Sequence, residues 1–322
     1  MHEKIAVIID FLTPAYEAQL RDAAARNGYD IVFFPSSRAA EGNVDDCAII
    51  YGHPSQRVIA GAKKLKWYAC CWAGVDHFCR DELYQDPACL LTNASGAYGV
   101  TIAEHAVMVT LMLLRREMEY AEIIREGGWR VLPGGIRSLH GARVTCLGTG
   151  DIGTEFARRL RAFQPERLVG VNRSGRAHPE FDEVRTVSAL DAVLPETDVL
   201  FMSLPSTPDT VNILNAERMA LLPEGAYVVN VGRGTAIDQD ALIAALDSEH
   251  LAGAALDVVV PEPLPAEHPL RGAKNLLLTP HVAGNMTLGY TCARNVEMFC
   301  ENLDNYAAGR PLKQLVDRKR GY

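Results

Sequence analysis

The chain has 322 residues, of which 48% are hydrophobic and 22% charged, and these proportions predict two folded domains rather than a disordered chain. Its formal net charge of -8 argues against a nucleic-acid partner, because such binding depends on basic residues that neutralise phosphates. With neither a signal-peptide pattern nor an apolar stretch that could cross a bilayer, we expect a cytoplasmic protein with no membrane contact, no metal and eight buried, reduced cysteines.

The first block of the chain alternates short apolar runs with amphipathic helical runs. This rhythm is typical of a parallel α/β layer. We expect strands at residues 5–9, 31–34, 48–51 and 67–71, and helices at residues 14–26 and 58–64. A longer helix is predicted at residues 101–119. It is apolar around almost its whole circumference, so we expect it to pack between domains or between subunits.

A second α/β block begins at Arg143. Its predicted strands lie at residues 144–147, 168–172, 199–204, 226–231, 252–256 and 276–279, and its predicted helices at residues 152–163 and 239–248. This succession predicts a complete doubly wound parallel sheet. A last helix, at residues 290–306, would return to the first block.

A glycine-rich turn opens the second block. Gly148, Gly150 and Gly153 form the pattern G-x-G-x-x-G directly after an apolar strand and at the start of an amphipathic helix. In that setting the first glycine permits a tight turn, the second lets a pyrophosphate approach the backbone, and the third lets the helix pack on the strand. The helix N-terminus also attracts the anion. The turn therefore predicts a dinucleotide site.

The end of the next strand bears on which dinucleotide is bound. An NAD site usually carries Asp or Glu there, about 20 residues after the glycines, for the ribose hydroxyl. This sequence has Asn172, Arg173 and Ser174 instead. No carboxylate is present there to repel a 2′-phosphate, and Arg173 could pair with one, helped by Ser174 and Arg176, so we expect NADP to be preferred over NAD. The alternative is that both are ordinary surface arginines.

Three strand ends further along carry isolated polar residues. Arg233 follows a predicted strand and lies between two glycines, Glu262 lies between two prolines, and His281 ends the last strand. Because the carboxyl ends of strands in an open α/β sheet face the ligand, we expect these side chains to converge where a nicotinamide would lie. Taken singly, each could instead be a surface arginine, a solvated carboxylate or a core histidine.

These residues, with motifs spread over nearly the whole chain, resemble the D-2-hydroxyacid dehydrogenase family and its glyoxylate/hydroxypyruvate reductase-like branch. Besides the glycine turn, the motifs are Ala73-Gly74-Val75-Asp76, Ile102-Ala103-Glu104-His105, Leu204-Pro205, Gly232-Arg233-Gly234, Leu256-Asp257-Val258, Glu262-Pro263-Leu264, Thr279-Pro280-His281 and Gly309-Arg310-Pro311-Leu312. The resemblance implies two doubly wound parallel-sheet domains, with a Rossmann cofactor domain at residues 99–289 inserted in a flavodoxin-like substrate domain at residues 1–98 and 290–322. It also implies a homodimer formed through the cofactor domain.

The family pattern implies a role for each catalytic residue. His281 would donate a proton to the substrate carbonyl oxygen as hydride reaches the carbon, and would take it back in the oxidative direction, which suits imidazole. Glu262 would orient the ring through its other nitrogen. Arg233 would bind the substrate carboxylate, together with the backbone amides of Gly74 and Val75.

The glycine turn and the resemblance together define the expected cofactor site. Its members are Thr101, Gly148, Thr149, Gly150, Asp151, Ile152, Gly153, Asn172, Arg173, Ser174, Leu204, Pro205, Val231, Gly232, Arg233, Asp257, His281 and Gly284. Within this set, the resemblance implies that Asp257 bonds the nicotinamide carboxamide.

The sequence therefore predicts an NAD(P)-dependent oxidoreductase that interconverts a small 2-oxo acid and the D-2-hydroxy acid. We expect an NADPH-preferring reductase that acts on substrates such as glyoxylate or hydroxypyruvate. One alternative is an NAD-linked phosphoglycerate-type dehydrogenase, for which only His77 and Arg80 lie near the substrate loop as basic residues. The other is a non-catalytic dinucleotide-sensing protein of the corepressor type, although all three catalytic residues are intact.

Overall fold

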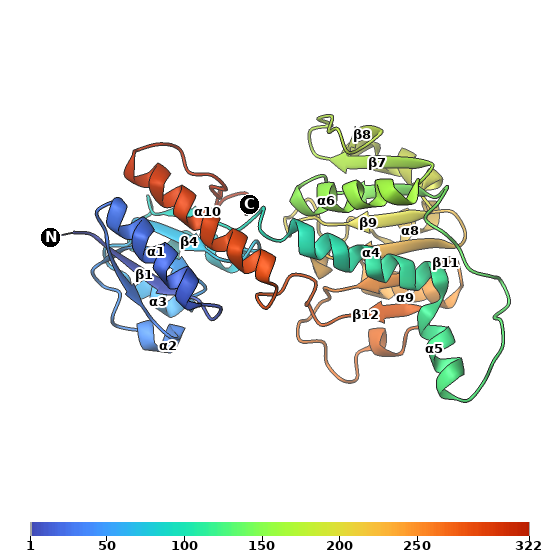
Figure 1. The fold of residues 1–322 in the computed structure, drawn as a ribbon. Coiled ribbons are helices and arrows are strands. Elements are labelled where there is room, and N and C mark those ends of the chain that lie inside the picture. The colour runs from blue at the N-terminus through green and yellow to red at the C-terminus, as the bar shows by residue number, and fades with distance from the viewer. Residues whose placement is uncertain (1, 322) are drawn as a thin grey trace. The chain divides into compact units, whose positions relative to one another are not determined.

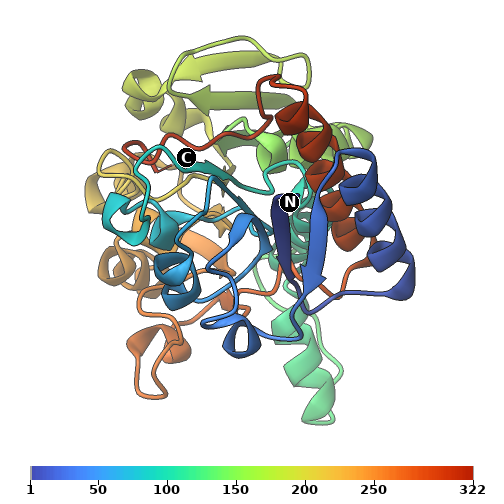
Figure 2. The ribbon, with the colours of Figure 1, turned by 90° about the vertical axis from the view of Figure 1, so that its left-hand side faces the viewer.

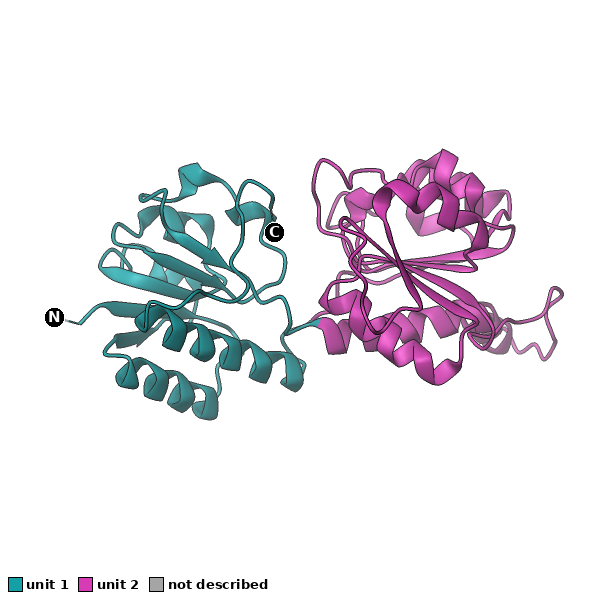
Figure 3. Ribbon diagram, turned by 90° about the horizontal axis from the view of Figure 1, so that it is seen from above, with its two compact units in different colours: residues 1–98, 285–322 teal, residues 99–284 magenta. Residues whose placement is uncertain are grey.

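Two parallel β-sheets, one of five strands and one of seven, organise the described part of the chain. The structure is a computed structural model and describes residues 2–321. It comprises two units, which Figure 3 colours separately: unit 1 is residues 1–98 and 285–322, and unit 2 is residues 99–284. The predicted class, two doubly wound parallel-sheet domains, is confirmed. The chain returns to unit 1 after Gly284, whereas the sequence suggested a crossing after residue 289.

Unit 1 is built on the five-stranded sheet, in the order β2-β1-β3-β4-β5 with all neighbours parallel. Its strands span Lys4–Ile8 (β1), Asp30–Phe33 (β2), Cys47–Gly52 (β3), Trp67–Cys70 (β4) and Leu90–Thr92 (β5). Its helices span Pro14–Arg26 (α1), Ser37–Ala40 (α2), Gln56–Gly61 (α3) and Gly289–Ala307 (α10). The inner strands are almost continuous runs of buried residues, as expected for a parallel sheet covered on both faces.

Alternate residues of the inner strands face opposite layers of helices. Tyr51 and Trp67 point towards α10, where both rings stack on Phe299. Ile50, the neighbour of Tyr51 on β3, lies in the hydrophobic cluster that α3 covers with Ile59. The sheet of unit 1 is therefore buried on both faces.

The C-terminal part of the chain completes unit 1. Helix α10 lies beside α1 in Figures 1 and 2, and Arg26 of α1 donates two bonds of 2.9 Å to the Asp304 carboxylate of α10. After α10 the chain runs along the edge of the sheet, where Leu315 forms an antiparallel bridge with Thr92 of β5. Unit 1 is thus assembled from the two ends of the sequence.

Unit 2 is built on the seven-stranded sheet, in the order β12-β11-β10-β9-β6-β7-β8, again with parallel neighbours. Its strands span Arg143–Leu147 (β6), Arg167–Asn172 (β7), Glu183–Thr186 (β8), Val199–Met202 (β9), Ala226–Asn230 (β10), Leu251–Leu256 (β11) and Leu276–Leu278 (β12). The strand order reverses between β6 and β9. Ligands of open α/β sheets bind at the carboxyl ends of the strands beside such a reversal.

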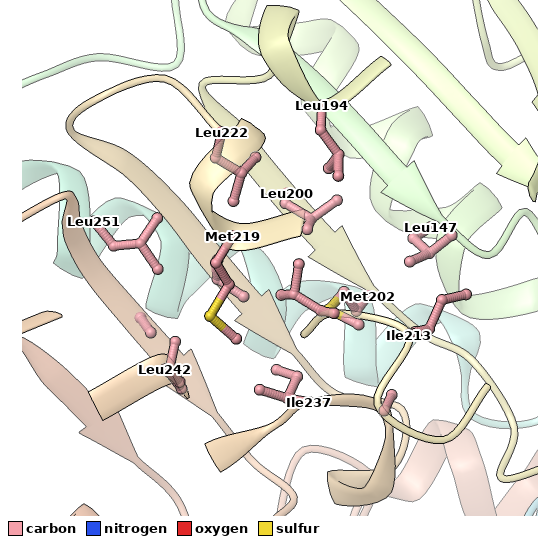
Figure 4. Close-up of a cluster of buried hydrophobic side chains, with 14 of the residues drawn as sticks. Leu147, Leu194, Leu200, Met202, Ile213, Met219, Leu222, Ile237, Leu242 and Leu251 are labelled. Carbon is pink, nitrogen blue, oxygen red and sulfur yellow. The ribbon is translucent and has the colours of Figure 1, made fainter. Parts of the chain in front are cut away.

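Helices cover both faces of this second sheet. They span Gly99–Arg115 (α4), Glu117–Arg125 (α5), Asp151–Leu160 (α6), Leu190–Val193 (α7), Ala216–Leu221 (α8) and Gln239–Asp247 (α9). Leu200 and Met202 of β9 pack with Met219 of α8 in the core shown in Figure 4. Phe201, between them on the strand, points to the other face and stacks on Phe156 of α6 at 4.0 Å between ring centres.

Short 3₁₀ helices complete the secondary structure. They span Asp76–Phe78, Asp81–Leu83, Arg161–Phe163, Val187–Ala189, Leu194–Glu196, Gly234–Ala236 and Pro269–Gly272. None of the helices in residues 2–321 has both the length and the apolar character that a membrane span requires.

The prediction of one helix over residues 101–119 is wrong. The helix ends at Arg115, and Arg116 takes a left-handed conformation with φ 54° before α5 begins. The Arg116 side chain holds the new direction, because it donates at 2.9 Å to Glu119 and also bonds the Pro133 carbonyl. In Figure 1, α5 and the segment after it extend away from the sheet of unit 2.

Candidate active site

The glycine turn forms an open cradle between β6 and α6. A Cβ atom on Gly153 would lie 2.0 Å from the Gly148 carbonyl oxygen, so only glycine lets α6 pack this closely on the turn. A Cβ on Gly150 would meet no heavy atom within 4 Å, and Gly150, as the N-cap residue of α6, has no side chain to cap the helix. An accessible backbone and an uncapped helix N-terminus fit a pyrophosphate group.

Asn172 joins this turn to the end of β7. Its side-chain nitrogen donates to Thr149 Oγ1 at 2.8 Å, and its Oδ1 accepts from the backbone N–H groups of Ser174 (3.0 Å) and Gly175 (2.7 Å). Asn172 thereby shapes the loop on which the side chains of Arg173 and Ser174 are exposed. The strand end next to the cradle carries a guanidinium where a carboxylate would disfavour a 2′-phosphate.

A buried polar residue shapes the turn that presents Arg233. Asn230, at the end of β10, is fully buried; its Oδ1 accepts from the Gly232 N–H and its Nδ2 donates to the Arg233 carbonyl, both at 3.0 Å. A Cβ on Gly234 would lie 2.4 Å from the carbonyl carbon of Val259. This close backbone contact places the Arg233 turn beside the loop that follows β11.

Glu262 and His281 make the direct side-chain contact of the site. His281 Nδ1 lies 2.7 Å from Glu262 Oε2, and Glu262 Oε1 accepts from the Val259 N–H at 3.0 Å. Half of the His281 side chain is exposed. Because an ionised carboxylate only accepts, Nδ1 donates to Glu262, and Nε2 is left as the ring nitrogen for a ligand.

Asp257 holds the loop that carries His281. Its carboxylate is buried and accepts from the Thr279 hydroxyl (2.6 Å) and from the N–H groups of Val282 (2.9 Å) and Ala283 (3.0 Å). These bonds stabilise the left-handed backbone of His281, which has φ 54°. A carboxylate offers about four acceptor positions. One therefore remains for the predicted bond to a nicotinamide carboxamide.

The remaining predicted cofactor residues lie around the same strand ends. A Cβ on Gly232 would lie 2.6 Å from Leu204 N, so the turns after β9 and β10 are in contact. The Asp151 carboxylate accepts from the Gly99 N–H at 2.8 Å and joins the starts of α4 and α6. Ile152 is in the first turn of α6, Pro205 and Val231 follow β9 and β10, and Thr101 and Gly284 lie near the two ends of unit 2.

The predicted substrate loop, with Gly74 and Val75, follows β4 in unit 1. The side chain of Asn93 donates to the Ala73 carbonyl at 2.8 Å and fixes the start of the loop. Within residues 2–321, neither the Gly74 N–H nor the Val75 N–H donates to a protein acceptor. Two successive backbone donors of this kind fit the predicted binding of a carboxylate.

Sequence reasoning assigned no role to three residues that shape the site: Asn230, Thr279 and Gln239. Gln239 bonds both backbone groups of Val260, at 2.6 and 2.8 Å, and so fixes the approach to Glu262. The available signal was a polar side chain at the end of a buried strand, as at Asn230. Among the described residues, no group of three or more His, Cys, Asp or Glu side chains could hold a metal ion.

Comparison with known proteins adds independent findings. Residues 107–283 match the family model "D-isomer specific 2-hydroxyacid dehydrogenase, NAD binding domain". The chain is also 32% identical, over 291 residues, to glyoxylate/hydroxypyruvate reductase A of Salmonella newport, an alignment that covers 88% of this chain and 90% of the relative.

Two solved structures are similar along the whole chain. A D-isomer specific 2-hydroxyacid dehydrogenase from Xanthobacter autotrophicus, in complex with NADPH and MES, has a TM-score of 0.84 and 29% identity and covers 100% of both chains. An NADPH-dependent glyoxylate/hydroxypyruvate reductase from Sinorhizobium meliloti, in complex with NADP and sulfate, has a TM-score of 0.84 and 27% identity, covering 99% of this chain and 100% of that one.

Proposed function

Because the chain belongs to the D-isomer-specific 2-hydroxyacid dehydrogenase family, we propose that it uses NADPH to reduce a small 2-oxo acid of the glyoxylate or hydroxypyruvate kind to the D-2-hydroxy acid. The observation that carries this proposal is the 2.7 Å contact between His281 and Glu262. This contact holds the imidazole through Nδ1 and leaves Nε2 as a proton donor. His281 follows a strand of the same sheet whose glycine turn fits a dinucleotide.

Substrate binding is assigned to Arg233 and to the backbone amides of Gly74 and Val75. A 2-oxo acid has a carboxylate beside its carbonyl group, and a planar guanidinium can bind a carboxylate with two parallel bonds. Holding the carboxylate fixes the position of the neighbouring carbonyl carbon, and this favours hydride transfer to that carbon. The nicotinamide, when bound, supplies the hydride that this carbon accepts.

The proton is assigned to His281. As the carbonyl carbon gains a hydride, negative charge develops on its oxygen, and protonated His281 gives that oxygen the proton of Nε2. Glu262 accepts from Nδ1 throughout and keeps the ring in position. In the oxidative direction, Nε2 takes the proton from the hydroxyl group of the 2-hydroxy acid.

The preference for NADPH is assigned to the loop after β7. Its support is the exposed Arg173 beside Ser174, together with the absence of a carboxylate at this strand end. A guanidinium pairs with a phosphate through charge-assisted bonds that the ribose hydroxyl of NADH cannot make. Both similar structures described above hold NADPH or NADP.

A kinetic panel tests the proposal. NADPH and NADH oxidation is measured with glyoxylate, hydroxypyruvate, pyruvate and 3-phosphohydroxypyruvate. We expect turnover of the first two with a higher kcat/KM for NADPH. A preference for NADH with the phosphorylated acid would favour a phosphoglycerate-type dehydrogenase. Tight NADPH binding without turnover of any 2-oxo acid would favour a dinucleotide-sensing protein.

We further propose that the protein forms a homodimer through unit 2. The support is a set of exposed apolar side chains on α5 and the segment after it, where Trp129 is 93% and Val131 84% exposed. Exposed apolar groups of this kind favour burial against another protein surface. Sedimentation should give twice the 35.2 kDa chain mass. Replacing both Trp129 and Val131 by Glu should give monomers, and a monomeric wild type would refute the proposal.

A further inference from the structure

We propose that His105 is a positioning residue for the reaction, which acts through Thr279 and the Asp257 carboxylate on the loop that presents His281. The inference rests on the proposed function. His105 lies on α4, within the motif Ile102-Ala103-Glu104-His105 that the proposed mechanism leaves without a role.

Three side chains form a line of hydrogen bonds from α4 to the catalytic loop. His105 Nε2 lies 3.3 Å from Thr279 Oγ1, and the Thr279 hydroxyl donates to Asp257 Oδ1 at 2.6 Å. The same carboxylate accepts from the N–H groups of Val282 and Ala283, on the far side of His281. His105 is thereby connected to both flanks of the catalytic histidine.

The donors and acceptors in this line can be ordered in one way. An ionised carboxylate only accepts, and a hydroxyl group has a single proton to donate. The proton of Thr279 is used on Asp257, so its oxygen must accept in the 3.3 Å contact and His105 must donate through Nε2–H. Neutral His105 is therefore the tautomer that carries its proton on Nε2.

The surroundings of His105 favour this neutral donor. Burial lowers the pKa of His105, and the negative charge of Asp257 opposes that shift only in part. Asp257 itself is only 4% exposed, so water offers little competition for its bonds. At neutral pH the line thus runs from the partly buried His105 and Thr279 to a buried carboxylate, where its hydrogen bonds are strongest.

The catalytic consequence follows from the backbone of His281. Its left-handed conformation is held by bonds that converge on Asp257, and the position of its ring relative to Glu262 depends on that loop. Loss of the His105 bond would release Thr279 and, through Asp257, shift the imidazole. A catalytic group displaced by about 1 Å can lose on the order of 10²-fold in rate.

Matched variants test the kinetic part. His105→Leu and Thr279→Val remove the bonds at similar volume, whereas His105→Gln and Thr279→Ser keep a donor or hydroxyl. We expect kcat at saturating NADPH to fall roughly tenfold in each variant of the first pair. In the second pair, kcat should be close to the wild-type value. The isotope effect with NADPH deuterated at the transferred position should rise only in the first pair.

A double variant and a control complete the kinetic test. Because His105 acts through Thr279, His105→Leu should add no loss to Thr279→Val. His250→Leu is the control, since the His250 side chain is also half-buried in unit 2 and its ring bonds only the Met219 carbonyl among described residues. It should keep kcat even if stability falls. Unchanged kcat in His105→Leu, or losses that multiply in the double variant, would overturn the inference.

Proton–nitrogen NMR spectra of the histidine rings provide a readout that needs no turnover. We expect His105 of the wild-type protein to carry its proton on Nε2, and its ring signals to change in Thr279→Val. A proton on Nδ1 in place of Nε2 would overturn the assigned directions of the hydrogen bonds. If no 2-oxo acid is a substrate, the proposed function fails while these spectra still test the hydrogen-bond line.

Discussion

Each side chain of the site has a fixed role as a hydrogen-bond donor or acceptor. Glu262 accepts a backbone N–H on one oxygen and the His281 ring on the other. Sequence reasoning could select Arg233, Glu262 and His281, because each is a reactive side chain in a segment that follows an apolar strand. It could not assign the partners of Asp257, because these depend on how the next loop folds back.

Glu262→Gln should therefore impair catalysis. The substitution turns one acceptor oxygen into an NH₂ donor, which must face either the Val259 N–H or the His281 ring. We expect kcat/KM for the 2-oxo acid to fall by about thirtyfold, corresponding to about 2 kcal/mol for a lost bond to a charged group. Steady-state kinetics checks this, with Glu267→Gln in the same exposed loop as the control. Equal activity of both variants would be inconsistent with the assigned role.

Arg173→Ala should change cofactor selectivity. If Arg173 pairs with the 2′-phosphate, its loss should reduce kcat/KM for NADPH by about tenfold or more and leave kcat/KM for NADH unchanged. Arg173→Lys should retain part of the effect, because lysine keeps the charge but not the planar fork. The two cofactors are compared at a fixed 2-oxo acid concentration. Equal losses for both would show that Arg173 does not read the phosphate.

An ion pair joins β6 and β9 of unit 2 at the amino ends of the strands, opposite the strand ends that carry the candidate site. Asp198, before β9, accepts from the Arg143 backbone N–H at 2.8 Å and from its guanidinium at 3.1 and 2.7 Å. Burial pushes the pKa of Asp198 upwards, but the bonds from Arg143 outweigh it and hold the pKa below its ordinary value. This pair fixes the register of β6 and β9 at their starts.

The pair should contribute to stability in a pH-dependent way. A carboxyl group whose pKa is lower in the folded state stabilises the fold above its unfolded pKa, and this contribution is lost as pH falls through the folded value. Asp198→Asn should lower the free energy of unfolding at neutral pH by about 1 kcal/mol. It should also flatten the loss of stability below about pH 4. Urea unfolding at several pH values measures both, and an unchanged acid slope would contradict the prediction.

Long apolar elements could be predicted from sequence, whereas breaks and short edge elements could not. The strands at the centre of both sheets are continuous buried runs, and their positions could be predicted from the apolar runs in the sequence. The break after α4, at the left-handed Arg116, has no glycine or proline to mark it, since this turn depends on bonds from Arg116 to Glu119 and Pro133. Strand β8 is only partly buried and lacks the apolar pattern that marks the others.

The whole molecule consists of a continuous unit inserted in a discontinuous one. Unit 2 is a single stretch, residues 99–284, with its own sheet and hydrophobic core, whereas unit 1 needs both ends of the chain. This arrangement could be predicted from the family resemblance, because the motifs that carry the resemblance follow one another along nearly the whole chain. The point of return after Gly284 was less predictable, since no composition change marks it.

Unit 2 should fold and bind nucleotide by itself. A stretch with a complete sheet and core meets the requirements of an independent domain. We expect a fragment of residues 99–284, with Trp129 and Val131 changed to Glu for solubility, to unfold cooperatively and to bind NADPH. Circular dichroism and cofactor fluorescence measure the two properties. A fragment that shows no cooperative transition would mean that unit 2 depends on the rest of the chain.

The most direct test of the whole account is the rate of NADPH oxidation in a single turnover with glyoxylate, for the wild type and for His281→Asn. Asparagine tolerates the left-handed backbone and can still bond Glu262, so the loop should keep its shape while the proton donor is lost. We expect the transient rate to fall by on the order of 10²-fold or more, with a much smaller change in NADPH affinity. An unchanged transient rate in the variant would contradict the assignment of His281 as the proton donor.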